Sequence, residues 1–274
     1  MTRMTRISLS IAAFAAALAA SPVPRSAPAT AAAPAKTATA EISHEASAAL
    51  LRMGETLRAA GQFSFEAHTI RVYSDASGEP LHIFHALKVT VRRPNRMLGQ
   101  IRGDDGSAEL FFDGKTATLF SAAEKKYVVI PIPEGTIEGM LGEAVDRIGV
   151  DFPLADFLSD APNKAFLSGI TAGRLVNTVT IDGAPYDHLF FSQPPGIELE
   201  LWLAKSTRSL PRRLIVTYRL LPGQPNFIAE FSNGNFDIHP YDADFIFQPP
   251  AGAVQAALKP VAAAAPHRSR GGRK

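Results

Sequence analysis

Apolar and polar side chains alternate along residues 197–219, IELELWLAKSTRSLPRRLIVTYR, and this alternation constrains the fold more than any other feature of the sequence. Successive side chains of a β-strand point to opposite faces, so a period of two separates an apolar face from a polar one. In the first half, one face carries Ile197, Leu199, Leu201 and Leu203, and the other carries Glu198, Glu200 and Trp202. After the polar stretch at 204–209, the apolar positions resume with Leu214, Val216 and Tyr218, and only Ile215 interrupts them. The segment predicts two antiparallel strands whose apolar face covers another part of the protein.

The same period of two recurs along most of the chain. Strand patterns occupy residues 62–74, 81–93, 95–102, 107–112, 117–121, 126–132, 174–182, 186–192 and 227–231. Asp113 and Gly114 supply a two-residue hairpin turn between two of these segments. We therefore expect on the order of ten or eleven strands, joined mainly by hairpins, in a single sheet.

Three segments have the helical period instead. Ser43 precedes apolar residues that are spaced as on one face of a helix, and Gly61 suits the end of that helix. Residues 136–148 carry one apolar stripe, and Pro153 suits the first turn of a short helix at 153–158. Because strongly twisted sheets of this width tend to curl, we predict an α+β fold: a strongly bent antiparallel sheet, an unclosed half-barrel, wrapped around two or three helices. The helices either leave a cavity inside the half-barrel or fill it as a dry core.

The two ends of the chain differ in composition from the part between them. Residues 1–19 combine Arg3 and Arg6 with an apolar run and a small-residue cleavage site, the pattern of a secretory signal peptide. This run is too short and too rich in alanine to favour a membrane anchor. Residues 20–40 are rich in Pro and Ala and predict a disordered linker, and 256–274 predict a disordered basic tail. The folded domain is therefore expected at 41–255, in the periplasm.

The net charge of +2 is that of the whole chain, whereas the predicted folded domain is acidic. Nine of the 28 Lys and Arg residues lie at 1–40 or 259–274, which leaves 19 against all 26 acidic residues. The domain therefore lacks the cationic surface that binds phosphate backbones, so we expect no nucleic-acid partner. The chain has no cysteine, which excludes disulfides, thiolate catalysis and a lipid-modified cysteine.

Side-chain patterns that would indicate catalysis are weak. The sequence has neither a glycine-rich phosphate loop nor a G-x-S-x-G nucleophile motif. Glu198 and Glu200 share a strand face, as paired catalytic carboxylates could, but a solvated charged row beside Arg213 explains them with less assumed. His82 and His85 are three residues apart on a strand, so their rings should lie on opposite faces rather than share a metal ion. We expect no enzyme activity, no cofactor and no metal site.

Several motifs together resemble a known superfamily. LELWLAKSTRSLPRRLIVTY resembles the strand, turn and strand of LolA-like periplasmic lipoprotein carriers and receptors. TIEGMLGEAVDRIGVDFPLADFLSD, LPRRLIVTYRLLPGQPNFIAEFSNGNF and FIFQPPAGA are similar to an uncharacterised family of predicted periplasmic proteins within that superfamily. Ala204 and Ser209 depart from the Asp and Gly that the carriers tend to have in the turn. The resemblance implies an unclosed sheet around helices with a hydrophobic cavity between them.

This resemblance implies a binding or carrier protein for a lipid, a lipoprotein acyl chain or another hydrophobic ligand. The candidate cavity residues are Leu199, Leu201, Val216, Phe190 or Phe191, Met140 and Leu141. Each acyl methylene buried against them would contribute about 0.8 kcal/mol. The alternative is an envelope sensor or assembly factor that binds another protein through the face of the sheet.

The signal-peptide prediction has a direct test. We expect the mature chain to begin near Ala20 and to be recovered in the soluble periplasmic fraction, because signal peptidase cleaves after small residues. N-terminal sequencing of the fractionated protein measures this. Membrane-bound protein that retains residues 1–19 would contradict it.

Overall fold

The computed structural model describes residues 41–74, 79–148 and 152–258, so the predicted signal peptide, the linker and most of the tail lie outside the described residues. Within the described part, twelve strands form one sheet in the order β12-β6-β5-β4-β3-β2-β1-β11-β10-β9-β8-β7. The strands are β1 (Gln62–Ser74), β2 (Pro80–Arg92), β3 (Arg96–Gly103), β4 (Gly106–Phe112), β5 (Thr116–Ser121), β6 (Lys126–Pro131), β7 (Ala172–Ile181), β8 (Ala184–Gln193), β9 (Ile197–Ala204), β10 (Pro211–Tyr218), β11 (Asn226–Asn235) and β12 (Val254–Gln255). All neighbours pair antiparallel except the short pair of β12 with β6. The predicted α+β fold with an unclosed antiparallel sheet is confirmed.

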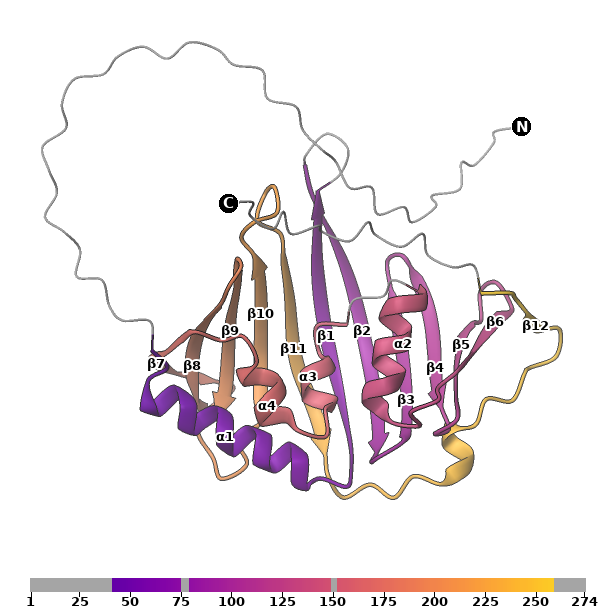
Figure 1. The fold of residues 1–274 in the computed structure, drawn as a ribbon, viewed down its shortest axis with the longest axis horizontal. Helices are drawn as coiled ribbons and strands as arrows, with labels where there is room; N and C mark the ends of the chain where they lie inside the picture. The colour runs from indigo at the N-terminus through magenta and orange to yellow at the C-terminus, as the bar shows by residue number, and fades with distance from the viewer. Residues whose placement is uncertain (1–40, 75–78, 149–151, 259–274) are drawn as a thin grey trace, which may run out of the picture. The chain divides into compact units, whose positions relative to one another are not determined.

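The helices lie against one face of this sheet (Figure 1). They are α1 (His44–Ala59), α2 (Ile137–Ile148), α3 (Ala155–Leu158) and α4 (Pro162–Leu167), and a 3-10 helix η1 (Asp242–Phe245) follows β11. The hydroxyl of Ser43 caps α1 by accepting from the N–H of Ala46, as the sequence predicts. The sequence interpretation missed α4, which begins with proline at its first position. None of the helices in the described part of the chain is long and apolar enough to cross a membrane.

The alternation at 197–219 places the apolar side chains on the helix-facing side of the sheet. Leu201 and Leu214 are paired across β9 and β10, and both are almost completely buried. Leu199 pairs with Val216 in the same way. Ile215, the residue that interrupts the pattern, lies on the opposite face, which we call the outer face. The predicted pair of strands and its apolar face are confirmed.

Two hydrophobic cores fill the space between the sheet and the helices. The first core joins α1, α3 and α4 to β7–β11 and the adjacent β1 and β2. The second core joins α2 and Leu158, the last residue of α3, to β1–β6. Phe65 and Phe152 are half-buried and pack against both cores, so they mark the seam between them. The two cores therefore meet beneath α3, which contributes Phe157 to the first core and Leu158 to the second.

A C-terminal strap, residues 236–255, leaves β11 and reaches the far edge of the sheet, where β12 pairs with β6 (Figure 1). The ring of Phe247 contacts the outer-face rings of Phe111, Phe120 and Tyr127, at centroid distances of 5.4, 5.2 and 5.0 Å. Phe245 is completely buried beneath the guanidinium of Arg92. The strap thus covers the outer face of β4–β6 and protects the edge of β6 from further pairing.

The burial of Leu201 predicts a large effect of its truncation. Leu201→Ala should lower the free energy of unfolding by about 2–5 kcal/mol, because it leaves a cavity in a closely packed core. Leu221→Ala, the same change at a half-exposed position after β10, is the control and should cost less than about 0.5 kcal/mol. Chemical denaturation of both variants measures the difference. Equal small losses would show that the first core is loosely packed at β9.

Candidate functional site

The predicted cavity residues on β8, β9 and β10 lie in the first core. Leu201 and Phe191 are almost fully buried, at 2% and 1% exposure, and Val216 is buried beside them. Leu199 is half-buried at the margin and pairs with both Phe191 and Val216. These four side chains form one continuous apolar surface under α1, α3 and α4.

The two predicted residues on α2 lie elsewhere. Met140 is completely buried in the second core, and Leu141 is half-buried against it. The chain enters α2 directly after β6, and the N–H of Ile137 donates to the carbonyl of Pro94 at the turn between β2 and β3. This attachment holds α2 over β1–β6 and away from β9. The structure therefore does not bring Met140 and Leu141 together with the residues of β9.

Phe190 lies on the outer face, because neighbouring residues of a strand point in opposite directions. It pairs with Glu200, and the guanidinium of Arg174 lies 5.2 Å from the centre of its ring. Of the two alternatives on β8, Phe191 is the one that faces the helices.

The two histidines of β2 lie on opposite faces, as predicted. His82 pairs with Val72 and is exposed, whereas the ring of His85 lies 2.7 Å from a carboxylate oxygen of Asp105. No group of three or more His, Cys, Asp or Glu side chains that could hold a metal ion occurs in the described ranges.

Arg93, which the sequence analysis overlooked, connects the sheet to the helix cover beside the seam. Its side chain is 10% exposed, and one guanidinium nitrogen donates to the carbonyl of Leu158 at 2.8 Å and to Asp160 at 2.9 Å. Burial lowers the pKa of Arg93, and the hydrogen bond that Arg93 donates to the carboxylate of Asp160 opposes that effect. Two further nitrogens of the guanidinium, Nε and Nη2, are buried without a hydrogen-bond partner among the described residues. Such an arrangement is costly, because unpaired buried polar groups lose their hydration.

A second carboxylate ties the same end of α3 to α2. Glu138 accepts hydrogen bonds from the hydroxyl of Ser159 and from the N–H of Asp160. We call Arg93, Glu138, Ser159 and Asp160 the polar latch. Its three segments, Arg93, Glu138 and residues 159–160, are far apart in sequence, and Arg93 follows Arg92 in a segment whose charges suggest only a solvated turn. The pairing therefore had no signal in the sequence.

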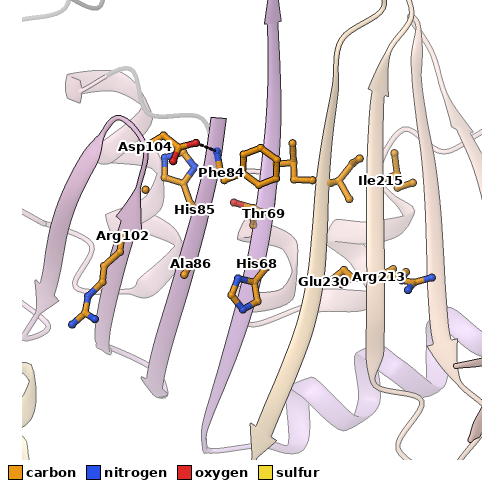
Figure 2. Close-up of a pocket in the computed structure, with 13 residues that line it drawn as sticks. His68, Thr69, Phe84, His85, Ala86, Arg102, Asp104, Arg213, Ile215 and Glu230 are labelled. Carbon is orange, nitrogen blue, oxygen red and sulfur yellow. Dashed lines mark hydrogen bonds and ion pairs between the residues drawn. The ribbon is translucent and has the colours of Figure 1, made fainter. Parts of the chain in front are cut away.

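The outer face carries a hollow of about 540 Å³ over β1, β2, β3, β10 and β11 (Figure 2). Four apolar side chains cross it in register on four adjacent strands: Phe84, Ile70, Ile228 and Ile215. A second row runs beside them and contains the polar residues Arg102, His68, Glu230 and Arg213, with Ala86 between Arg102 and His68. Ile215, which interrupts the alternation in the sequence, is thus part of an apolar row on the outer face.

The fold and its interior define a class of protein: an unclosed antiparallel sheet with helices against one face and apolar cores between the two layers. The chain belongs to the family described as predicted periplasmic protein (DUF2092), whose model matches residues 46–259. This match confirms the family that the sequence motifs resemble. No curated protein matches the sequence.

Solved structures with a similar arrangement share little sequence with this chain. The Mycobacterium tuberculosis lipoprotein LppX is 16% identical, with a TM-score of 0.45, over 72% of this chain and 99% of that protein. The LolA superfamily protein NE2245 from Nitrosomonas europaea is 12% identical, with a TM-score of 0.37, over 73% and 96% of the two chains. The Pseudomonas aeruginosa MucA/MucB complex contains a chain that is 18% identical, with a TM-score of 0.40, over 74% and 61%.

The polar latch predicts which part of the cover opens first when it is broken. Arg93→Met removes both bonds to the end of α3, so backbone amides at 155–167 should exchange with solvent faster by about tenfold or more. Arg92→Met is the matched control, because Arg92 binds Asp242 and the carbonyl of Pro240 in the strap. Hydrogen exchange should then increase at 236–247 instead. Identical exchange patterns in the two variants would contradict a specific role for Arg93.

Proposed function

We propose that this protein is a non-enzymatic periplasmic binding or carrier protein for a lipid, a lipoprotein acyl chain or another hydrophobic ligand. The observation that carries this proposal is the seam at Phe65 and Phe152, where the two cores meet and the polar latch joins α3 to α2 and to the sheet. The ligand would enter between the sheet and the helices at this seam. Membership in a family of predicted periplasmic proteins supports the compartment.

The chemistry of the interior suits a flexible apolar ligand. Contacts between the helices and the sheet in the two cores are apolar and therefore non-directional. Acyl methylenes could therefore take the place of apolar side-chain atoms without needing a fixed geometry. Each methylene that leaves water contributes about 0.8 kcal/mol, so a chain of about ten methylenes contributes roughly 8 kcal/mol before the cost of opening the cover. The latch contributes directional bonds that ligand entry would break. It would thus set how readily the cover opens.

Two surfaces would receive the ligand, depending on which helices move. Displacement of α1, α3 and α4 would expose the surface made by Leu199, Leu201, Val216 and Phe191. Displacement of α2 would expose the surface around Met140 and Leu141. Leu199 and Leu141 are the half-buried members of these sets and lie at the margins where an entering chain makes its first contacts.

A second candidate function is the binding of another envelope protein through the outer face of the sheet. The apolar row in the outer-face hollow favours it, because a row of this length on a solvated sheet is otherwise left in contact with water. The two functions use opposite faces and do not exclude each other.

The carrier proposal predicts a bound lipid and a binding activity controlled by the latch. Protein purified without detergent should release a stoichiometric lipid on organic extraction, identified by mass spectrometry. Delipidated protein should bind a fluorescent C16 fatty acid, and Arg93→Met should bind it faster than wild type, because the cover opens more often.

Arg92→Met is the control for both measurements and should bind the probe at the wild-type rate. Thermal melting of each variant shows whether it remains folded. If the wild type yields no lipid and binds no probe, the carrier proposal is wrong. If Arg93→Met folds and binds at the rate of Arg92→Met, the latch does not control entry.

A further inference from the structure

The turn that follows β2 places one cation beside the seam between the two cores. The backbone N–H of Arg93 donates to the carbonyl of Gly61 at 2.8 Å, which fixes the start of the side chain beside β1. The guanidinium carbon lies 5.8 Å from the centre of the Phe63 ring. That ring stacks on Phe65, which packs against both cores. Because the side chain is only 10% exposed, its charged group belongs to the interior rather than to the surface.

The guanidinium uses only one of its edges to hold the polar latch. Nη1 donates both to the carbonyl of Leu158 and to the carboxylate of Asp160. Nε and Nη2 form a second edge, whose N–H groups point in the same direction because the group is planar. Both nitrogens are buried, and neither has a hydrogen-bond partner among the described residues. Since buried donors are almost always paired in folded proteins, this edge indicates a place for an acceptor that the described residues do not supply.

The charges around Arg93 favour a neutral acceptor over an anion. Asp160 already forms an ion pair with the guanidinium, and the charge of Glu138 also acts on it. One cation thus faces two carboxylates, and an anionic head group would add a further negative charge at close range. A neutral carbonyl oxygen accepts through two lone pairs and adds no charge. Hydrogen bonds from a charged donor to such an oxygen are stronger than those between neutral groups.

The surroundings of this edge favour a carbonyl that carries an alkyl chain. Phe65 and Phe152 mark the seam, Phe63 lies beside it, and the two cores extend from it on either side. An acyl group has a carbonyl at the head of a run of methylenes. It can therefore accept from Arg93 while its chain replaces apolar contacts beneath the helices. A small hydroxyl compound would satisfy the donors but would leave the apolar surface without a partner.

We propose that Nε and Nη2 of Arg93 bind the neutral carbonyl oxygen at the head of an acyl chain that is linked through an ester or an amide. Arg93 then has a separate role on each edge: Nη1 holds the closed latch, and the other edge recognises the ligand. This inference rests on the proposed carrier function and adds the chemical group by which the ligand is recognised. It makes the seam selective for acylated molecules over alkyl ligands of equal chain length.

The test compares two ligands that differ in the carbonyl alone. Palmitoyl lysophosphatidylcholine has an acyl ester, and its O-hexadecyl analogue has the same head group and chain length with an ether in that place. Each lipid, below its micellar concentration, displaces the fluorescent C16 fatty acid from delipidated mature protein. The wild type should bind the ester at least about tenfold more tightly than the ether, because the ether oxygen is the weaker acceptor for a charged donor.

Variants separate recognition of the ligand from opening of the latch. Arg93→Met should abolish the preference, so that ester and ether bind equally. Arg92→Met is the matched control and should keep the preference, since Arg92 binds the strap. Ser159→Ala removes the hydroxyl that donates to Glu138, so it weakens the latch and leaves the second edge of Arg93 unchanged. It should speed the binding of both lipids and keep the preference. Because the preference compares two ligands on one variant, a general loss of stability cancels.

An N-palmitoyl pentapeptide tests the amide linkage. Loss of affinity for the lysolipid in Arg93→Met identifies an ester-linked lipid as the ligand, and loss of affinity for the peptide identifies an acylated protein. The infrared carbonyl stretch of an isotope-labelled ligand is an independent readout. Hydrogen bonds from Arg93 should lower its frequency in the wild type relative to Arg93→Met, which a purely structural role of Arg93 would not do.

Different results would overturn this inference and the carrier proposal. Equal binding of ester and ether by the wild type would overturn the inference and leave the carrier proposal standing. A wild type that binds neither lipid, nor the peptide, nor the fatty acid would overturn the carrier proposal and this inference with it. If Arg93→Met weakens palmitate by about tenfold but leaves the ratio of ester to ether affinity unchanged, the second edge binds an anion instead of an acyl carbonyl.

Discussion

The burial of one apolar face of an unclosed sheet is the constraint on which the rest of this structure depends. A sheet that does not close on itself must cover that face with other elements and must protect its two edges. Here the helices α1 to α4 supply the cover, and β12 pairs along the edge of β6. At the other edge, residues just before α1 bind β7, where the N–H of Ser43 donates to the carbonyl of Gly173. The segments near both ends of the described domain thus pair with the outermost long strands of the sheet, β6 and β7.

Apolar contacts alone do not determine where short helices lie on such a face. Hydrophobic burial is roughly proportional to area and has no direction, so many positions of α2 and α3 would bury similar surfaces. Hydrogen bonds restrict these positions. The N–H of Ile137 binds the carbonyl of Pro94, and Arg93 binds the end of α3, so both elements are attached at the turn between β2 and β3. This shared attachment holds α3 where the two cores meet, with Phe157 in the first core and Leu158 in the second.

The two faces of the sheet offer different binding chemistry. The helix-facing side is closed and apolar, and it suits a ligand that replaces side-chain contacts after the cover opens. The outer face is open and carries an apolar row beside charged side chains of both signs, and it suits a partner that has a polar side of its own. Ile70 on the outer face and Ala67 in the first core lie on the same strand, so one strand contributes to both surfaces.

The sequence by itself determined the strands, the capped helix after Ser43 and the faces of β9 and β10, because period and local hydrogen bonding act over a few residues. The sequence also contains the motifs that resemble the family of predicted periplasmic proteins. It did not determine which helix covers which strands, so Met140 and Leu201 were expected at one cavity and lie in separate cores. Nor could it pair Arg93 with Asp160 or align Ile215 with Ile70 and Phe84, since these contacts join residues far apart in sequence. Only the tertiary structure decided them, because the register of a twelve-stranded sheet depends on all its strands together.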